Sequence, residues 1–116
     1  MDARIERLGA WGCDVKGALN RMLDDEDFYL ECLAAIPGDP NYAALEEALR
    51  AHDGKKAFDC AHTLKGVLAN MGLTPLYAKT EEIVEPLRAG RCDGSLLERA
   101  EELNRLKDRL AEILES

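Results

Sequence analysis

The sequence predicts an all-α domain, arranged as an antiparallel up-down-up-down four-helix bundle with short additional helices at the N-terminal end. Three observations favour this fold class. Apolar residues recur at the spacing of helix faces, and β-branched residues never alternate with polar ones as a half-buried strand requires. The four prolines and nine glycines fall mostly at the expected ends of these segments. The longer helical segments are joined by short connections, which favours antiparallel neighbours.

Length and composition indicate one domain over residues 1–116, with residues 1–13 as an N-terminal helical extension. A chain of 116 residues, 47% hydrophobic and 33% charged, is globular and large enough to fold without a metal or disulfides. The net charge of −8 argues against binding to nucleic acid or to an anionic membrane surface. No apolar run approaches the ~18 residues of a membrane span, and the charged N-terminus lacks the apolar region of a secretory signal.

The four cysteines form no CxxC pair, so neither a zinc site nor a thioredoxin-like redox site is indicated. A disulfide scaffold is normally shorter and richer in cysteine. We therefore expect reduced thiols and a cytoplasmic protein.

Three helices are expected in the N-terminal third. The first covers residues 4–10, and Asp14 is placed to cap the second, over residues 15–23. The acidic run 24–27 suits the positive N-terminal end of a third helix, which Pro37-Gly38 stops. Its expected apolar side consists of Phe28, Leu30, Leu33 and Ile36.

The fourth helix starts at Asp39-Pro40, a capping residue followed by a proline in the first turn, and runs out near residues 52–54. The fifth covers about residues 55–71 and ends at Gly72, which suits a left-handed cap. The expected apolar positions of the fourth helix are Tyr42, Leu45, Ala48 and Leu49.

The sixth helix begins at Thr74-Pro75 and has Leu76, Ile83, Val84 and Leu87 on its apolar side. Pro86 lies inside it and removes one backbone donor, so we expect a bend or an early end there. Ser95 and Glu98 match a capping box for the last helix, which runs to about Leu114. Its expected apolar positions are Leu96, Ala100, Leu103, Leu106, Leu110 and Ile113.

The segment 55–72, KKAFDCAHTLKGVLANMG, carries the candidate functional residues. On a wheel of ~100° per residue, His62 falls on the side opposite the apolar face and is expected to face solvent. The apolar face itself gathers Ala57, Cys60, Ala61, Leu64, Val67, Leu68 and Met71.

The neighbours of His62 on this face are unusual for a solvated helix surface, which is normally rich in charge. Phe58, Ala69 and Gly66 border it, with Lys65 three residues on. Glycine inside a helix costs about 0.5–1 kcal/mol relative to alanine, and room for another molecule to approach the imidazole is one reason to tolerate that cost. Lys65 can reach an anionic group carried by His62. An imidazole is a competent nucleophile near neutral pH.

Other readings of these residues are more ordinary. Phe58 either closes the edge of the bundle or belongs to an apolar docking patch, and we favour docking. Asn70 is a polar surface residue near a helix end. Cys60 lies on a different face from His62, which argues against a Cys–His nucleophilic pair. His52, Cys60 and His62 lack the spacing of metal ligands, so no metal site is expected.

Residues 61–66, AHTLKG, followed by Asn70 and Gly72, resemble the signature of the histidine-containing phosphotransfer (HPt) domain family. That signature is His-x-Leu-Lys-Gly with a further glycine ten residues after the histidine. The resemblance covers roughly residues 14–116. It implies that His62 carries the phosphoryl group, that Lys65 stabilises the phosphate and that Gly66 clears room beside the imidazole.

The resemblance also implies the partners and the chemistry. A response-regulator receiver domain, a hybrid histidine kinase or both would exchange a phosphoryl group with His62, with Phe58, Gly66 and Ala69 at the docking surface. The chain would be a phosphocarrier without catalytic machinery of its own, with no cofactor, because magnesium belongs to the receiver. We expect a monomer. Val67-Leu68 and Pro86 depart from the family pattern and bear on packing and helix length.

Two alternatives stay open at this stage. One is an interaction module that docks a receiver or a helix while His62 is never phosphorylated. The other is a detached substrate domain that a histidine kinase phosphorylates directly. The first methionine and the absence of a long tail favour a free-standing shuttle over an excised piece.

Overall fold

The structure is a computed structural model that describes residues 1–115, and within them it contains helices, turns and loops but no strand. The prediction of an all-α fold is confirmed. The elements are α1 (Ala3–Ala10), α2 (Val15–Arg21), α3 (Glu26–Ala35), the 3₁₀ helix η1 (Ile36–Gly38), α4 (Asn41–Arg50), α5 (Gly54–Asn70), α6 (Thr74–Arg88) and α7 (Ser95–Glu115).

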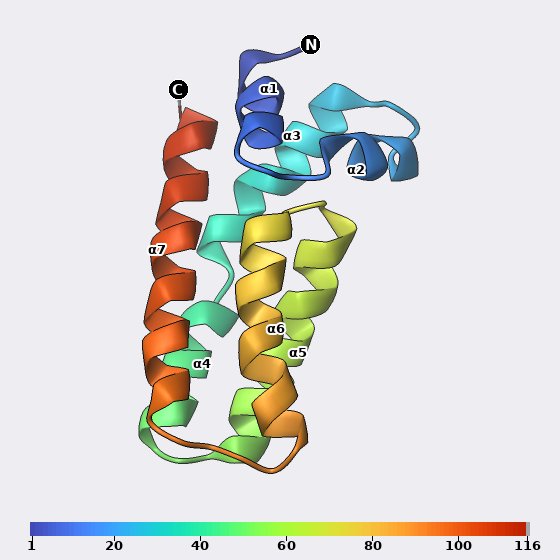
Figure 1. The fold of residues 1–116 in the computed structure, drawn as a ribbon. Helices are drawn as coiled ribbons and strands as arrows, with labels where there is room; N and C mark the ends of the chain where they lie inside the picture. Colours follow the sequence, from blue (N-terminus) through green and yellow to red (C-terminus); the bar gives the residue numbers. More distant parts are fainter. Residues whose placement is uncertain (116) are drawn as a thin grey trace.

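Helices α4 to α7 surround one core (Figure 1). Helix α5 packs against α4 and α6, and α7 packs against the same two helices from the other side. Helices α1, α2 and α3 gather at one end of this bundle, where α1 and α3 contact α7 (Figure 1). The largest buried aliphatic side chains include Leu45, Leu64, Leu68, Leu76, Ile83, Leu96 and Leu103.

Aspartates start four of the helices. Asp2, Asp14, Asp25 and Asp53 each accept a hydrogen bond from a backbone N–H of the first turn that follows. Each such cap satisfies a donor that the helix leaves unpaired, which stabilises the fold by about 1 kcal/mol. The predicted cap at Asp14 is confirmed, and Asp53 sets the start of the helix that carries His62.

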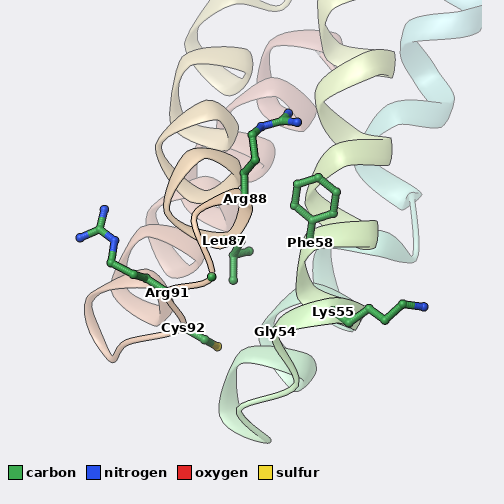
Figure 2. Close-up of a pocket in the computed structure, with 8 residues that line it drawn as sticks. Gly54, Lys55, Phe58, Leu87, Arg88, Arg91 and Cys92 are labelled. Carbon is green, nitrogen blue, oxygen red and sulfur yellow. The ribbon is translucent and has the colours of Figure 1, made fainter.

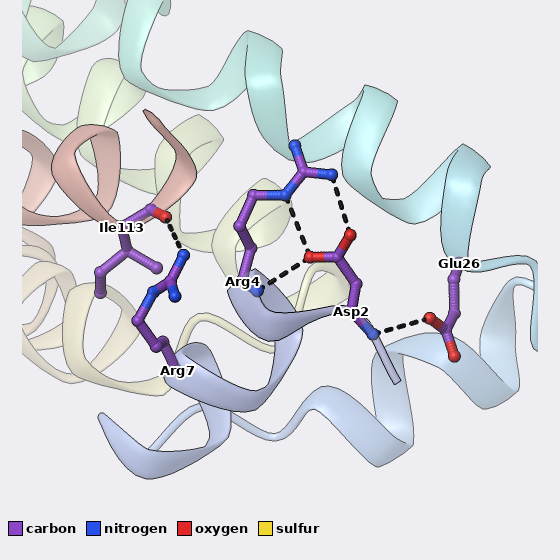
Figure 3. Close-up of polar contacts among 5 residues, drawn as sticks. All are labelled: Asp2, Arg4, Arg7, Glu26 and Ile113. Atoms are coloured by element: carbon purple, nitrogen blue, oxygen red, sulfur yellow. Dashed lines mark hydrogen bonds and ion pairs between the residues drawn. The ribbon is translucent and has the colours of Figure 1, made fainter. Parts of the chain in front are cut away.

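The first residues are tied to the bundle by polar contacts as well as by apolar burial (Figure 3). The Arg4 guanidinium donates to Asp2, and this hydrogen bond lowers the pKa of that carboxyl to about 2. Arg7 Nη2 donates to the Ile113 carbonyl of α7 at 3.3 Å. Ile5 and Leu8 are fully buried, so α1 adds apolar surface to the same core.

The apolar side of α3 differs from the one expected. Phe28 is 49% exposed, whereas Tyr29 is fully buried beside Leu33. The Tyr29 hydroxyl donates to the Met71 carbonyl at 2.8 Å. Because this bond satisfies its polar tip, tyrosine can be buried there, where it joins α3 to the end of α5.

Two helix ends also differ from the prediction. Helix α2 stops at Arg21 because Leu23 and Asp24 adopt left-handed backbone, with φ of +55° and +60°. At the start of α7 the Asp93 carboxylate accepts from the N–H and hydroxyl of Ser95. The Ser95 hydroxyl therefore serves as a donor to Asp93, in place of the expected capping box with Glu98.

Helix α6 does not end early at Pro86 but continues to Arg88. The proline removes one backbone donor in the last turn, where its fixed φ is compatible with a helix. Ile83, Val84 and Leu87 around it are buried, and their packing offsets the lost hydrogen bond. Because α6 extends through Arg88, the guanidinium of this residue lies over the Phe58 ring of α5.

Gly72 locks the N-terminal segment against the turn between α5 and α6. Its φ is +69°, its carbonyl accepts from the Asp14 N–H at 2.8 Å, and an added Cβ would lie 2.3 Å from the Asp14 carbonyl oxygen. We expect Gly72→Ala to lower the free energy of unfolding by about 3 kcal/mol, through left-handed strain and the clash.

Urea unfolding followed by circular dichroism measures this loss, with Gly90→Ala as the matched control. Gly90 has φ of +83° but no atom within 4 Å of an added Cβ, so its variant should lose only about 1–2 kcal/mol of strain. Equal losses in the two variants would show that the contact with Asp14 does not matter.

Candidate functional site

The helix α5 separates its buried and exposed faces as the sequence predicts. The side chains of Ala57, Cys60, Ala61, Leu64 and Leu68 are buried. His62 is exposed near the middle of the helix, so the imidazole is open to a second molecule. The prediction that this ring faces solvent is confirmed.

The ring of Phe58, one helical turn before His62 in α5, packs against the imidazole. The two rings are stacked, with centroids 5.4 Å apart and planes 11° from parallel. The Arg88 guanidinium of α6 lies over the Phe58 ring, with Cζ 5.4 Å from the ring centroid, and Figure 2 shows the two side chains facing each other between the helices. Phe58 therefore both closes the edge of the bundle and orients His62.

Lys65 is held by α6. Its Nζ lies 3.8 Å from Glu85 Oε1 and 5.9 Å from the centroid of the Tyr77 ring. Within residues 1–115 it makes no hydrogen bond to His62. The ammonium group is one turn from the imidazole but paired with another side chain, so it must turn to meet a group on His62.

Glu85 pairs with two cations beside the imidazole. In addition to Lys65, it lies 3.7 Å from Arg88 Nε. The sequence does not predict a role for Glu85, Arg88 or Tyr77, because they lie on the next helix and nothing local in the sequence links them to His62. The i, i+3 spacing of Glu85 and Arg88 predicts only that these two meet.

Gly66 and Ala69 leave the region ahead of His62 open. Both residues are exposed, and a Cβ added at Gly66 would meet no atom within 4 Å.

Ala69 lines a cavity of about 260 Å³ together with Tyr77 and Arg21. Arg21 of α2 donates to the carbonyls of Ala69 and Asn70, at 3.1 Å and 2.8 Å. The end of α5 is thus capped from outside, by a residue that the sequence did not single out.

The remaining candidate groups do not join this site. Burial raises the pKa of the Cys60 thiol, which keeps it protonated and a poor nucleophile. All four cysteines are unpaired. His52 ends the turn after α4 with φ of +56°. Residues 1–115 contain no cluster of three His, Cys, Asp or Glu side chains arranged to hold a metal ion. No helix in that range is long and apolar enough to cross a membrane.

The chemistry available here is that of an exposed imidazole stacked on Phe58, with Lys65 one helical turn away and open space at Gly66. Such a group can attack an electrophile delivered by a partner. The cations can neutralise an anionic group that is left on the ring.

Comparison with known proteins agrees with this geometry. A family model described as the Hpt domain matches residues 39–116, which contain α4 to α7 together with His62, Lys65 and Gly66. Separate searches of curated proteins and of solved structures each found no match. Hpt domains are phosphotransfer modules of two-component signalling that interact with receiver domains and kinases. The matched region spans more than half of the chain and includes the imidazole site, and we conclude that this chain belongs to the Hpt domain family.

Proposed function

We propose that the chain is a phosphorelay intermediate in which His62 accepts a phosphoryl group from the aspartate of a receiver domain, or from a kinase, and passes it to another receiver. The observation that carries the proposal is the exposed imidazole of His62, stacked on Phe58 with open space at Gly66. When His62 accepts the group, a nitrogen–phosphorus bond forms as the bond between the donor and phosphorus breaks. When His62 passes it on, the nitrogen–phosphorus bond breaks as an oxygen of the acceptor aspartate forms its bond to phosphorus. The partner supplies magnesium and most catalytic groups, so this chain acts as a carrier and not as an enzyme.

The proposal also includes the domain organisation, the order of the helices and the docking surface. Residues 1–116 act as one monomeric cytoplasmic domain, with residues 1–13 as a helical extension whose Ile5 and Leu8 enter the core. The bundle has up-down-up-down order, which the ring of contacts among α4 to α7 and their short connections support. Phe58, Gly66 and Ala69 face the docked receiver.

The direct test is to mix the chain with candidate phosphorylated receivers and to look for phosphate that is labile in acid and stable in base, located at His62. Transfer back to a second receiver would establish the shuttle. An interaction module would instead bind the receiver without ever gaining acid-labile phosphate. A detached kinase substrate would gain it from a kinase and ATP but not from a phosphorylated receiver.

Lys65 and Glu85 should act in opposite directions on this transfer. Lys65→Ala should slow it by about tenfold, because a charge-assisted contact to the phosphoryl oxygens is lost. Glu85→Gln should speed it by about two- to fivefold, because the variant releases Lys65 and Arg88 from an exposed carboxylate. Rapid-quench measurement of labelled phosphate on His62 gives both rates.

Two further variants make the comparison specific. Glu112→Gln removes the same charge from α7, where that residue pairs with Arg109, and should leave the rate unchanged. In Lys65→Ala/Glu85→Gln most of the gain from the glutamine should disappear. If Glu85→Gln speeds transfer as much without Lys65 as with it, the carboxylate does not act through Lys65.

A further inference from the structure

A cavity of about 350 Å³ lies between the start of α5 and the end of α6, and Phe58 is the one residue that it shares with the site predicted from the sequence. Phe58, Leu87 and Cys92 form its apolar part. Lys55, Arg88 and Arg91 also line it, and the side chains of Lys55 and Arg91 extend outward from its two sides (Figure 2). We call these six residues the basic pocket. Ligand pockets range from about 300 to 1,000 Å³, so this one suits a single anchoring group of a larger partner.

The charge of the basic pocket is opposite to that of the chain as a whole. The net charge is −8, yet three cationic residues line this cavity. Arg88 pairs with Glu85, whereas the side chains of Lys55 and Arg91 have no ion pair or hydrogen bond within residues 1–115. A local positive region attracts the acidic surface of a partner.

The position of the basic pocket links it to His62. Phe58 belongs to both, because its ring stacks on the imidazole and also lines the cavity. A partner that reaches His62 is therefore separated from the pocket only by the Phe58 ring. A receiver presents its aspartate beside a magnesium ion, which proteins hold mainly with carboxylates, so its active face is acidic.

From this geometry we propose that the basic pocket is a second anchoring point for the receiver. It takes one apolar side chain of the receiver, and Lys55, Arg88 and Arg91 pair with carboxylates that flank that side chain. Docking then covers His62 and the pocket together. This inference rests on the proposed function and adds to it a binding site for the partner at the N-terminal end of α5.

The test measures the dissociation constant of the receiver that phosphorylates His62, at low and at physiological salt. Arg91→Glu should weaken binding about five- to tenfold at low salt and less at high salt. Arg105→Glu makes the same charge change at an exposed position of α7 and should have little effect. Phosphorylation of His62 by phosphoramidate should be the same in all three proteins, because a small donor needs no docking.

A second measurement reads the cavity directly. In a Cys32→Ser background Cys92 is the remaining partly exposed thiol, since Cys13 and Cys60 are buried. Bound receiver should slow alkylation of Cys92 by iodoacetamide severalfold. Equal affinities for Arg91→Glu and Arg105→Glu, or a Cys92 as reactive in the complex as in the free chain, would overturn the pocket proposal. If no receiver phosphorylates the unaltered chain, the proposed function itself fails, and the pocket proposal falls with it.

Discussion

Replacing His62 with glutamine should abolish phosphorylation of the chain by a phosphorylated receiver. The lone pair of an amide nitrogen is delocalised into the carbonyl, so glutamine cannot replace imidazole as the nucleophile. The fold should survive, because the side chain is exposed and loses only its stacking on Phe58, worth about 0.5–1.5 kcal/mol. Labelling with a radioactive phosphoreceiver measures the first effect, and urea unfolding measures the second.

The chain contains two histidines, which supplies a matched control. His52 is exposed and lies in the left-handed region at φ of +56°, where asparagine is tolerated. His52→Asn should therefore label normally. Acid-labile phosphate that persists in His62→Gln and disappears in His52→Asn would move the acceptor to the other histidine. If both variants are labelled, the assignment of phosphorylation to a single histidine is wrong.

Replacing Gly66 with leucine should reduce transfer from a receiver by about a hundredfold or more. In the proposed transfer the donor aspartate comes close to His62 through the open space beside it, and a displacement of the order of 1 Å at a reacting centre costs about a hundredfold in rate. Meanwhile the helix should become more stable, by about 1 kcal/mol, because leucine and alanine are better helix formers than glycine. A Cβ added at Gly66 meets no atom within 4 Å.

This opposite movement of stability and activity makes the Gly66 prediction specific. Gly66→Ala should show the same gain in stability with a much smaller loss of transfer. Phosphoramidate should still modify His62 in Gly66→Leu, since a small donor fits beside the larger side chain. Normal transfer from the receiver in Gly66→Leu, with the stability gain observed, would mean that the partner approaches from another side and that the glycine serves no clearance role.

The sequence alone determined the features that depend on periodicity along one helix. The spacing of Ala57, Cys60, Ala61, Leu64 and Leu68 defines a buried face, because a helix turns by a constant angle per residue. His62 and Gly66 then fall on the exposed face wherever the rest of the chain lies. The all-α class and most helix ends were predictable for the same reason, since caps and breakers act within a few residues.

The tertiary structure alone decided which residues from different helices meet. In α3 Tyr29 is buried where Phe28 was expected, because the Met71 carbonyl accepts a hydrogen bond from the Tyr29 hydroxyl. Lys65 is paired with Glu85 of α6. Arg88 covers Phe58 because α6 continues past Pro86. Contacts across helices depend on how two surfaces pack at particular heights and rotations. A single sequence carries no local signal of that, and so the imidazole could be located from its own helix while its cations, its carboxylate and its pocket could not.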